Sequence, residues 1–189
     1  MDSQIPTLYT DSAYTLISAE EISAMVDRLA AEIQSTYEGS GRRLVMVVIL
    51  KGSMPFAADL MKRLTLPIEL EFMKVSSYGA GTKSSGEIKV SLDISRDDLQ
   101  DIDLLVVEDI VDSGRTLFRL TQLLKNRNAH SVRTCTLLDK PSRREVDFIP
   151  DFCGTAIPDE FVIGFGLDYD EKYRNLPFVG VLKREVYEQ

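Results

Sequence analysis

The sequence predicts an α/β domain with a central, mainly parallel sheet flanked by helices. Two observations carry this prediction. Continuous apolar runs of strand length occur at residues 43–50 and 104–107, as is typical of buried parallel strands. Segments with helical apolar spacing alternate with such strands along the chain. At 189 residues, 44% of them hydrophobic, the chain can build one substantial core. We therefore expect a single domain over residues 1–189.

The first helix is expected over residues 17–37, where Ser18 and Glu21 form a capping box before a helical apolar stripe. The strand at residues 43–50 should lead through a turn into a second helix, which Ser53 would cap.

The next elements are an antiparallel pair of strands, at residues 68–78 and 86–94, whose polar and apolar residues alternate. The remaining expected elements are a strand at 104–107, a helix at 116–127, and strands at 132–140, 159–166 and 178–183. In an open α/β sheet, ligands bind beyond the carboxyl ends of the strands. That rule places four segments on one rim: Lys51 with Gly52, residues 108–116, Lys140, and the stretch after Phe161.

Composition excludes several function classes. The net charge is −8, which argues against a nucleic-acid binder with a basic face but not against small phosphorylated ligands. No run of about 18 apolar residues is present, so we expect no membrane span. The first residues lack the pattern of a secretory signal, and we expect a cytoplasmic protein. Cys135 and Cys153 are expected to be buried thiols of a cytosolic protein, and a disulfide between them is the alternative.

The stretch LLVVEDIVDSGRTL, residues 104–117, carries the strongest chemical signal. A buried strand ends in Glu108 and Asp109, and Asp112 opens a turn over residues 112–116, here called the phosphate turn. A glycine, hydroxyls and a helix N-terminus suit a phosphate, whereas paired carboxylates suit a diol or Mg²⁺. A ligand that has both a phosphate and a diol is a ribose 5-phosphate. An ordinary capped helix would explain DSG alone, but not the whole stretch.

VVEDIVDSGRTL resembles the phosphoribosyl pyrophosphate (PRPP) motif of the type I phosphoribosyltransferases. From about Tyr14 to Leu182 the chain resembles their hypoxanthine-guanine branch. The resemblance implies the type I fold, with a small hood formed by the terminal segments and a mobile two-stranded arm. It also implies purine salvage: Mg²⁺-dependent transfer of 5-phosphoribosyl from PRPP to hypoxanthine or guanine, giving IMP or GMP. A homodimer or homotetramer would be expected, with no nucleic-acid or membrane partner.

The resemblance also assigns the PRPP side of the site. Glu108 and Asp109 would hold the ribose hydroxyls, directly or through Mg²⁺, and Asp112 would act near purine N7 as a general base. LKGS would be the diphosphate loop, in which the peptide before Lys51 can be cis. The residues expected to bind PRPP are Lys51, Gly52, Glu108, Asp109, Asp112, Ser113, Gly114, Arg115, Thr116 and Arg174. Arg115 stands where this family often has lysine.

On the purine side, Lys140 would donate to the exocyclic oxygen of a 6-oxopurine, which disfavours adenine. Phe161 would stack on the base and Val162 would bind it through its backbone. Asp168 would coordinate Mg²⁺, so the expected metal ligands are Glu108, Asp109 and Asp168. Ser77 and Tyr78 would belong to the mobile arm.

Taken one at a time, these residues also have ordinary structural interpretations. Lys51 could be a surface lysine, Asp112 a helix N-cap and Phe161 a core residue, and the arm could be a simple hairpin tip. His130 lies outside every motif and is expected at the surface. Gly164 and Gly166 do not begin a dinucleotide fingerprint, because Tyr169 occupies the third glycine position.

Two alternative functions are compatible with the same fold. The first is a phosphoribosyltransferase that prefers xanthine. The second is a nucleotide-sensing regulator that binds RNA or DNA on the same fold, against which the net charge of −8 argues.

Overall fold

The computed structural model describes residues 8–77 and 88–188, apart from the side chains of residues 8, 9 and 77. Its main sheet has six strands in the order β4-β3-β2-β5-β6-β7. All neighbouring pairs are parallel except β3 with β4, which confirms both the mainly parallel sheet and the antiparallel pair. The strands are β2 (Arg43–Ile49), β3 (Ile68–Ser77), β4 (Ile88–Leu92), β5 (Ile102–Val111), β6 (Ser131–Asp139) and β7 (Phe152–Ala156).

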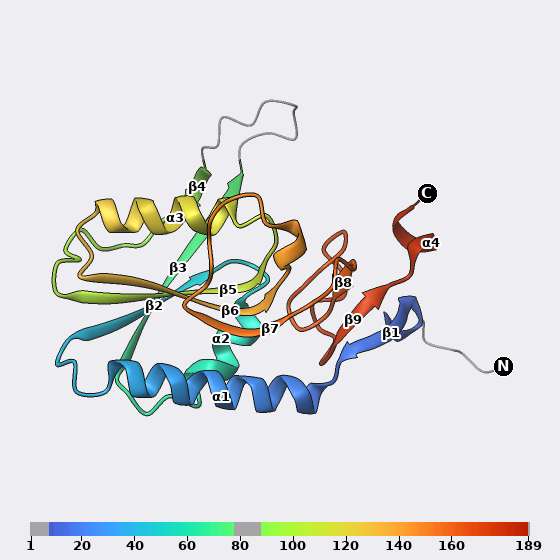
Figure 1. The fold of residues 1–189 in the computed structure, drawn as a ribbon, viewed down its shortest axis with the longest axis horizontal. Coiled ribbons are helices and arrows are strands. Elements are labelled where there is room, and N and C mark those ends of the chain that lie inside the picture. The colour runs from blue at the N-terminus through green and yellow to red at the C-terminus, as the bar shows by residue number, and fades with distance from the viewer. Residues whose placement is uncertain (1–7, 78–87, 189) are drawn as a thin grey trace.

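Helices cover both faces of this sheet (Figure 1). On one face lie α1 (Ala19–Tyr37) and α2 (Met54–Met61), and on the other lies α3 (Arg115–Asn126). Alternate residues of β2 and β5 enter two separate apolar cores, so the central strands are apolar on both sides. This explains the continuous apolar runs in the sequence.

A second sheet, in the order β1-β9-β8, forms the hood beside the carboxyl ends of the main strands (Figure 1). It combines β1 (Ser12–Ile17) near one terminus with β8 (Val162–Ile163) and β9 (Val179–Leu182) near the other, and α4 (Arg184–Tyr187) follows. The hood of terminal segments is thereby confirmed. The described residues also contain two short 3₁₀ helices, η1 (Leu8–Asp11) and η2 (Pro141–Arg143).

Three details of the sequence prediction were wrong. The strand expected at 159–166 shrinks to β8 and joins the hood, while β7 completes the main sheet. β1 and β7 were not predicted from the sequence, because both are short and only partly buried. Ser53 does not cap α2, since its hydroxyl donates instead to the Ile49 carbonyl.

Other local predictions agree with the structure. Ser18 and Glu21 form the expected capping box, with hydrogen bonds of 3.2 and 2.8 Å. Both cysteines are free, although Cys153 is only half-buried, so its expected burial was partly wrong. Within residues 8–77 and 88–188, no helix is long and apolar enough to cross a membrane. Tyr78, expected in the mobile arm, lies outside the described residues, as does the Ser77 side chain.

Candidate active site

The carboxyl ends of β2, β5 and β6 meet at one rim of the main sheet, beside the hood (Figure 1). Lys51 and Gly52 follow β2, the phosphate turn follows β5, and Lys140 follows β6. Residues 161–177, here called the closing segment, pack at the same edge, so the four segments predicted to share a rim lie together there.

Gly52 is the point where three of these segments touch. A Cβ added at Gly52 would lie 1.7 Å from Asp109 Oδ2, so the carboxylate packs directly on the glycine backbone. A Cβ added at Gly166 would lie 1.9 Å from the Gly52 carbonyl oxygen, and Gly166 has a φ of +101°. Only glycine fits at either position without displacing its neighbours. The Leu50–Lys51 peptide, which the sequence left open, is cis.

Arg174 joins the closing segment to this point. Its Nη1 donates to the Gly166 carbonyl at 2.8 Å, and its Nη2 lies 2.8 Å from Asp168 Oδ1. Glu171 contacts two cations, since its Oε2 is 3.0 Å from Lys51 Nζ and 3.3 Å from Arg174 Nη2. These hydrogen bonds lower the pKa of Glu171 below its ordinary value, the one from Lys51 most strongly. Two cations thus gather where a diphosphate is expected.

The phosphate turn borders a pocket of about 140 Å³, which is lined by Glu108, Ile110, Val111, Asp112, Ser113, Gly114, Thr116 and Leu117. Gly114 takes the N-cap position of α3 with a φ of +79°, so the helix N-terminus opens at this turn. N–H groups at a helix N-terminus attract anions. The guanidinium of Arg115 lies 2.5 Å from the Glu145 carboxylate.

Asp112 is not an N-cap, because Gly114 holds that position in α3. Its carboxylate is about half exposed, and Oδ1 lies 3.2 Å from Arg143 Nε. An exposed, oriented carboxylate beside the pocket is suited to accept a proton from a ligand.

The purine-side residues also lie together. Lys140 Nζ donates to the Glu160 carbonyl at 2.7 Å, immediately before Phe161. Phe161 is 38% exposed. Its ring stacks on Tyr187 with centroids 5.0 Å apart, and Tyr169 meets it edge-on at 5.5 Å. Phe161 is therefore a supported surface aromatic rather than a core residue. Val162 is buried in β8 and pairs with Val181.

Comparison with known proteins fixes the family. The phosphoribosyl transferase domain model matches residues 15–170. The chain is 48% identical over 178 residues to the hypoxanthine-guanine phosphoribosyltransferase of Bacillus subtilis, covering 94% of this chain and 97% of that protein. This chain belongs to the hypoxanthine-guanine phosphoribosyltransferases.

Further relatives and a solved structure support the same family assignment. The Lactococcus lactis enzyme is 51% identical over 91% of this chain and 92% of its own length. A solved hypoxanthine phosphoribosyltransferase from Staphylococcus aureus superposes with a TM-score of 0.92 at 42% identity, covering 98% of this chain and all of that one. The chain is also 47% identical to the bifunctional protein TilS/HprT of Listeria monocytogenes, of which it spans 28%.

Glu108 and Asp109 are consecutive residues near the end of β5. Burial raises the pKa of Glu108 well above its ordinary value, and the charge of Asp109 adds to the effect. Burial also raises the pKa of Asp109, opposed by hydrogen bonds from Glu108 and from the Ile110 N–H. Glu108 Oε2 is buried without a hydrogen-bond partner in the described part of the chain. Such a pair would be stabilised by a hydroxyl donor or a cation.

The acidic residues at this rim fit Mg²⁺, provided that the substrate supplies some of the ligands of the ion. Residues 8–77 and 88–188 contain no group of three or more acidic, histidine or cysteine side chains that could hold a metal ion. Mg²⁺ typically binds through one or two carboxylates plus substrate phosphates and keeps several waters. Glu108, Asp109 and Asp168 supply carboxylates of this kind.

Three contributors to the rim could not be predicted from the sequence: Glu171, Tyr187 and the segment 143–145. Glu171 belongs to a short acidic run that reads as a solvated loop, and Tyr187 lies near the chain end. Arg143 and Arg144 follow Lys140 so closely that they read as a minor basic cluster. Only the fold shows that they contact Asp112.

Proposed function

We propose that this protein transfers 5-phosphoribosyl from PRPP to N9 of hypoxanthine or guanine, giving IMP or GMP and diphosphate. The observation that carries the proposal is the order of groups along one rim. Cations suited to diphosphate come first, then an acidic pair suited to ribose, then a helix N-terminus suited to phosphate. Beside them lie a lysine and an aromatic ring suited to a 6-oxopurine. The names of the Bacillus and Lactococcus relatives support the choice of bases.

Each residue has a defined task in this proposal. Lys51 and Arg174 bind the diphosphate, Glu108 and Asp109 the ribose hydroxyls, and the phosphate turn the 5′-phosphate. Lys140 donates to the purine O6, the Val162 backbone binds the base edge, and Phe161 stacks on the ring. Asp112 takes the ring proton as the purine nitrogen attacks the anomeric carbon. Orientation of base and ribose in one pocket replaces an encounter in solution.

Mg²⁺ would be held by Glu108, Asp109 and Asp168 and would neutralise charge on the departing diphosphate. Ser77 and Tyr78 would close over the reaction and exclude water, which would otherwise hydrolyse the ribosyl centre.

The direct test is turnover of the purified protein with PRPP and Mg²⁺, with hypoxanthine, guanine, xanthine and adenine assayed separately. We expect IMP and GMP formation, inert adenine, and loss of turnover with EDTA. If xanthine is turned over fastest, the enzyme prefers xanthine and the proposed specificity for hypoxanthine and guanine is wrong. Turnover of none of the four bases would refute the proposed reaction.

Lys140→Gln should weaken the discrimination against adenine. Glutamine removes the fixed ammonium and offers a carbonyl acceptor to the adenine amino group. We expect the ratio of kcat/KM for hypoxanthine over adenine to fall by about 10²-fold or more. Lys172→Gln is the matched control, because Lys172 is an exposed lysine paired with Asp170 in the closing segment. If the ratio of kcat/KM for hypoxanthine over adenine is the same in both variants, Lys140 does not recognise the base.

We also propose a cytoplasmic homodimer or homotetramer. Leu70 and Phe72 of β3 are 39% and 41% exposed, although their register partners Met46 and Val48 are buried on the same face of the sheet. A second copy of the chain would cover this apolar surface. Phe72→Glu should therefore lower the mass measured by sedimentation equilibrium, whereas Glu20→Gln, at an exposed position of α1, should not. An unchanged mass for Phe72→Glu would place the interface elsewhere.

A further inference from the structure

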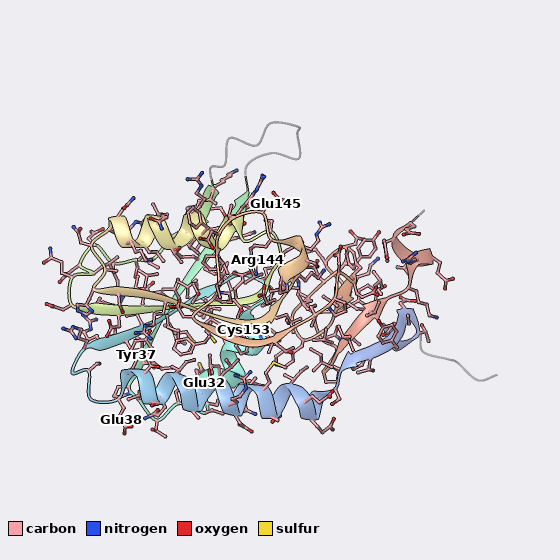
Figure 2. All side chains as sticks on the ribbon, viewed as in Figure 1. Glu32, Tyr37, Glu38, Arg144, Glu145 and Cys153 are labelled. Carbon is pink, nitrogen blue, oxygen red and sulfur yellow. The ribbon has the colours of Figure 1, made fainter. Side chains whose placement is uncertain are left out.

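The segment 143–145 crosses the phosphate turn from the side of η2. Figure 2 shows Arg144 and Glu145 near η2, on the side of the sheet that α3 covers. The Glu145 N–H donates to the Ser113 carbonyl at 3.0 Å, and the Glu145 carboxylate pairs with Arg115. The turn is thus tied to a segment that begins only three residues after Lys140.

Arg144 makes the most buried of these contacts, with only 15% of its side chain exposed. Its Nη1 donates to the Asp112 carbonyl at 2.6 Å, and its Nη2 donates to the carboxylate of Asp139, the last residue of β6. Its stem packs against Gly114, where an added Cβ would lie 2.9 Å from Arg144 Cδ. One guanidinium therefore bridges the turn and a central strand of the sheet.

These contacts set the direction of the N–H groups in the turn. In a trans peptide the carbonyl and the following N–H point to opposite sides of the chain. Because Arg144 holds the Asp112 carbonyl, the Ser113 N–H points away from the segment 143–145. Because the Glu145 N–H donates to the Ser113 carbonyl, the Gly114 N–H also points away from the segment 143–145. Two successive N–H groups turned to one side form a concave anion site.

We propose that Arg144 is a positioning residue that holds the phosphate turn in the conformation that binds the 5′-phosphate. The inference rests on the proposed function, since it assigns the 5′-phosphate to this turn. Arg144 acts through the Asp112 carbonyl and contacts no reacting atom. Its planar guanidinium serves the carbonyl and the Asp139 carboxylate together, which a lysine ammonium on a single flexible stem cannot reproduce.

The test compares IMP with inosine, which lacks the 5′-phosphate, in Arg144→Gln and Arg144→Lys. We expect the affinity for IMP and the KM for PRPP to worsen by about tenfold in Arg144→Gln, the size of one lost charge-assisted hydrogen bond. The affinity for inosine should stay within about twofold of wild type. Arg144→Lys keeps the charge and should fold, yet still lose part of the affinity for IMP.

Arg28→Gln is the matched control. Arg28 also bridges a backbone carbonyl and a carboxylate, donating to Gly154 O at 2.5 Å and Glu32 Oε1 at 2.7 Å, but it lies on α1, remote from the turn. Because the Arg28 side chain is 47% exposed, this variant should lose less thermal stability than Arg144→Gln, and it should keep the wild-type ratio of IMP to inosine affinity. An Arg144→Gln variant with that same wild-type ratio would overturn the positioning role.

Thr116→Ala separates failure of this inference from failure of the site assignment. A loss of IMP affinity in Thr116→Ala without one in Arg144→Gln would refute the Arg144 role alone. If Thr116→Ala and both Arg144 variants keep the wild-type ratio of IMP to inosine affinity in an active enzyme, the 5′-phosphate binds elsewhere and both assignments fail.

Discussion

Replacing Asp112 with asparagine should lower kcat for hypoxanthine by about 10²–10⁴-fold, the usual contribution of a general base. Asparagine keeps the size of the side chain and a carbonyl oxygen for Arg143, but it cannot accept the ring proton. Because the Asp112 backbone carbonyl still receives its hydrogen bond from Arg144, the phosphate turn should keep its shape. We therefore expect the KM for PRPP to change little. Initial-rate kinetics with each substrate varied in turn would separate the two parameters.

Asp159→Asn is the control for this prediction. Asp159 is another exposed carboxylate on Arg143, with Oδ2 lying 3.7 Å from Nη1. Its replacement should leave kcat within about twofold, since it removes a surface ion pair of small energy. Two results would count against Asp112 as the base: a wild-type kcat in Asp112→Asn, or a loss confined to the KM for PRPP.

The centre of the main sheet could be predicted because β2 and β5 are buried on both faces. Residues such as Val47 and Val106 face one core, and their neighbours Met46 and Leu105 face the other, which leaves an unbroken apolar run. β7 has no such signature, because its outer edge is open and its burial is partial. A short strand at the edge of a sheet has too few buried positions to show a clear alternation of apolar and polar residues in the sequence.

The parts of the site that are formed by residues close together in the sequence could be predicted. A glycine, acids and hydroxyls at one strand end indicate a phosphate and a diol whatever the rest of the chain does. By contrast, Arg144 reaches Asp112 across 32 residues and Lys51 reaches Glu171 across 120. No spacing rule connects positions so far apart, because only the fold brings them together. Identification of such partners requires the three-dimensional structure.

Gly166→Ala should destabilise the protein and disable the diphosphate side of the site together. The added Cβ would meet the Gly52 carbonyl oxygen at 1.9 Å, and the backbone φ of +101° strains any residue with a side chain. The diphosphate loop cannot move away from the added Cβ, because Asp109 packs on the other side of Gly52. We expect roughly 2–5 kcal/mol lower free energy of unfolding, from strain and overpacking together. Lys51 would shift with the loop, and kcat/KM for PRPP should fall sharply.

Gly39→Ala isolates the contribution of backbone strain in this comparison. Gly39 has a φ of +76°, but an added Cβ there would meet nothing within 4 Å. This variant should lose only about 1 kcal/mol and keep its kcat/KM for PRPP. Urea unfolding and steady-state kinetics on both variants would measure the two effects. If the variants prove equally stable and equally active, the contact between Gly166 and Gly52 does not hold the diphosphate loop in place. If Gly166→Ala alone loses stability and PRPP efficiency together, that contact is what couples the closing segment to the loop.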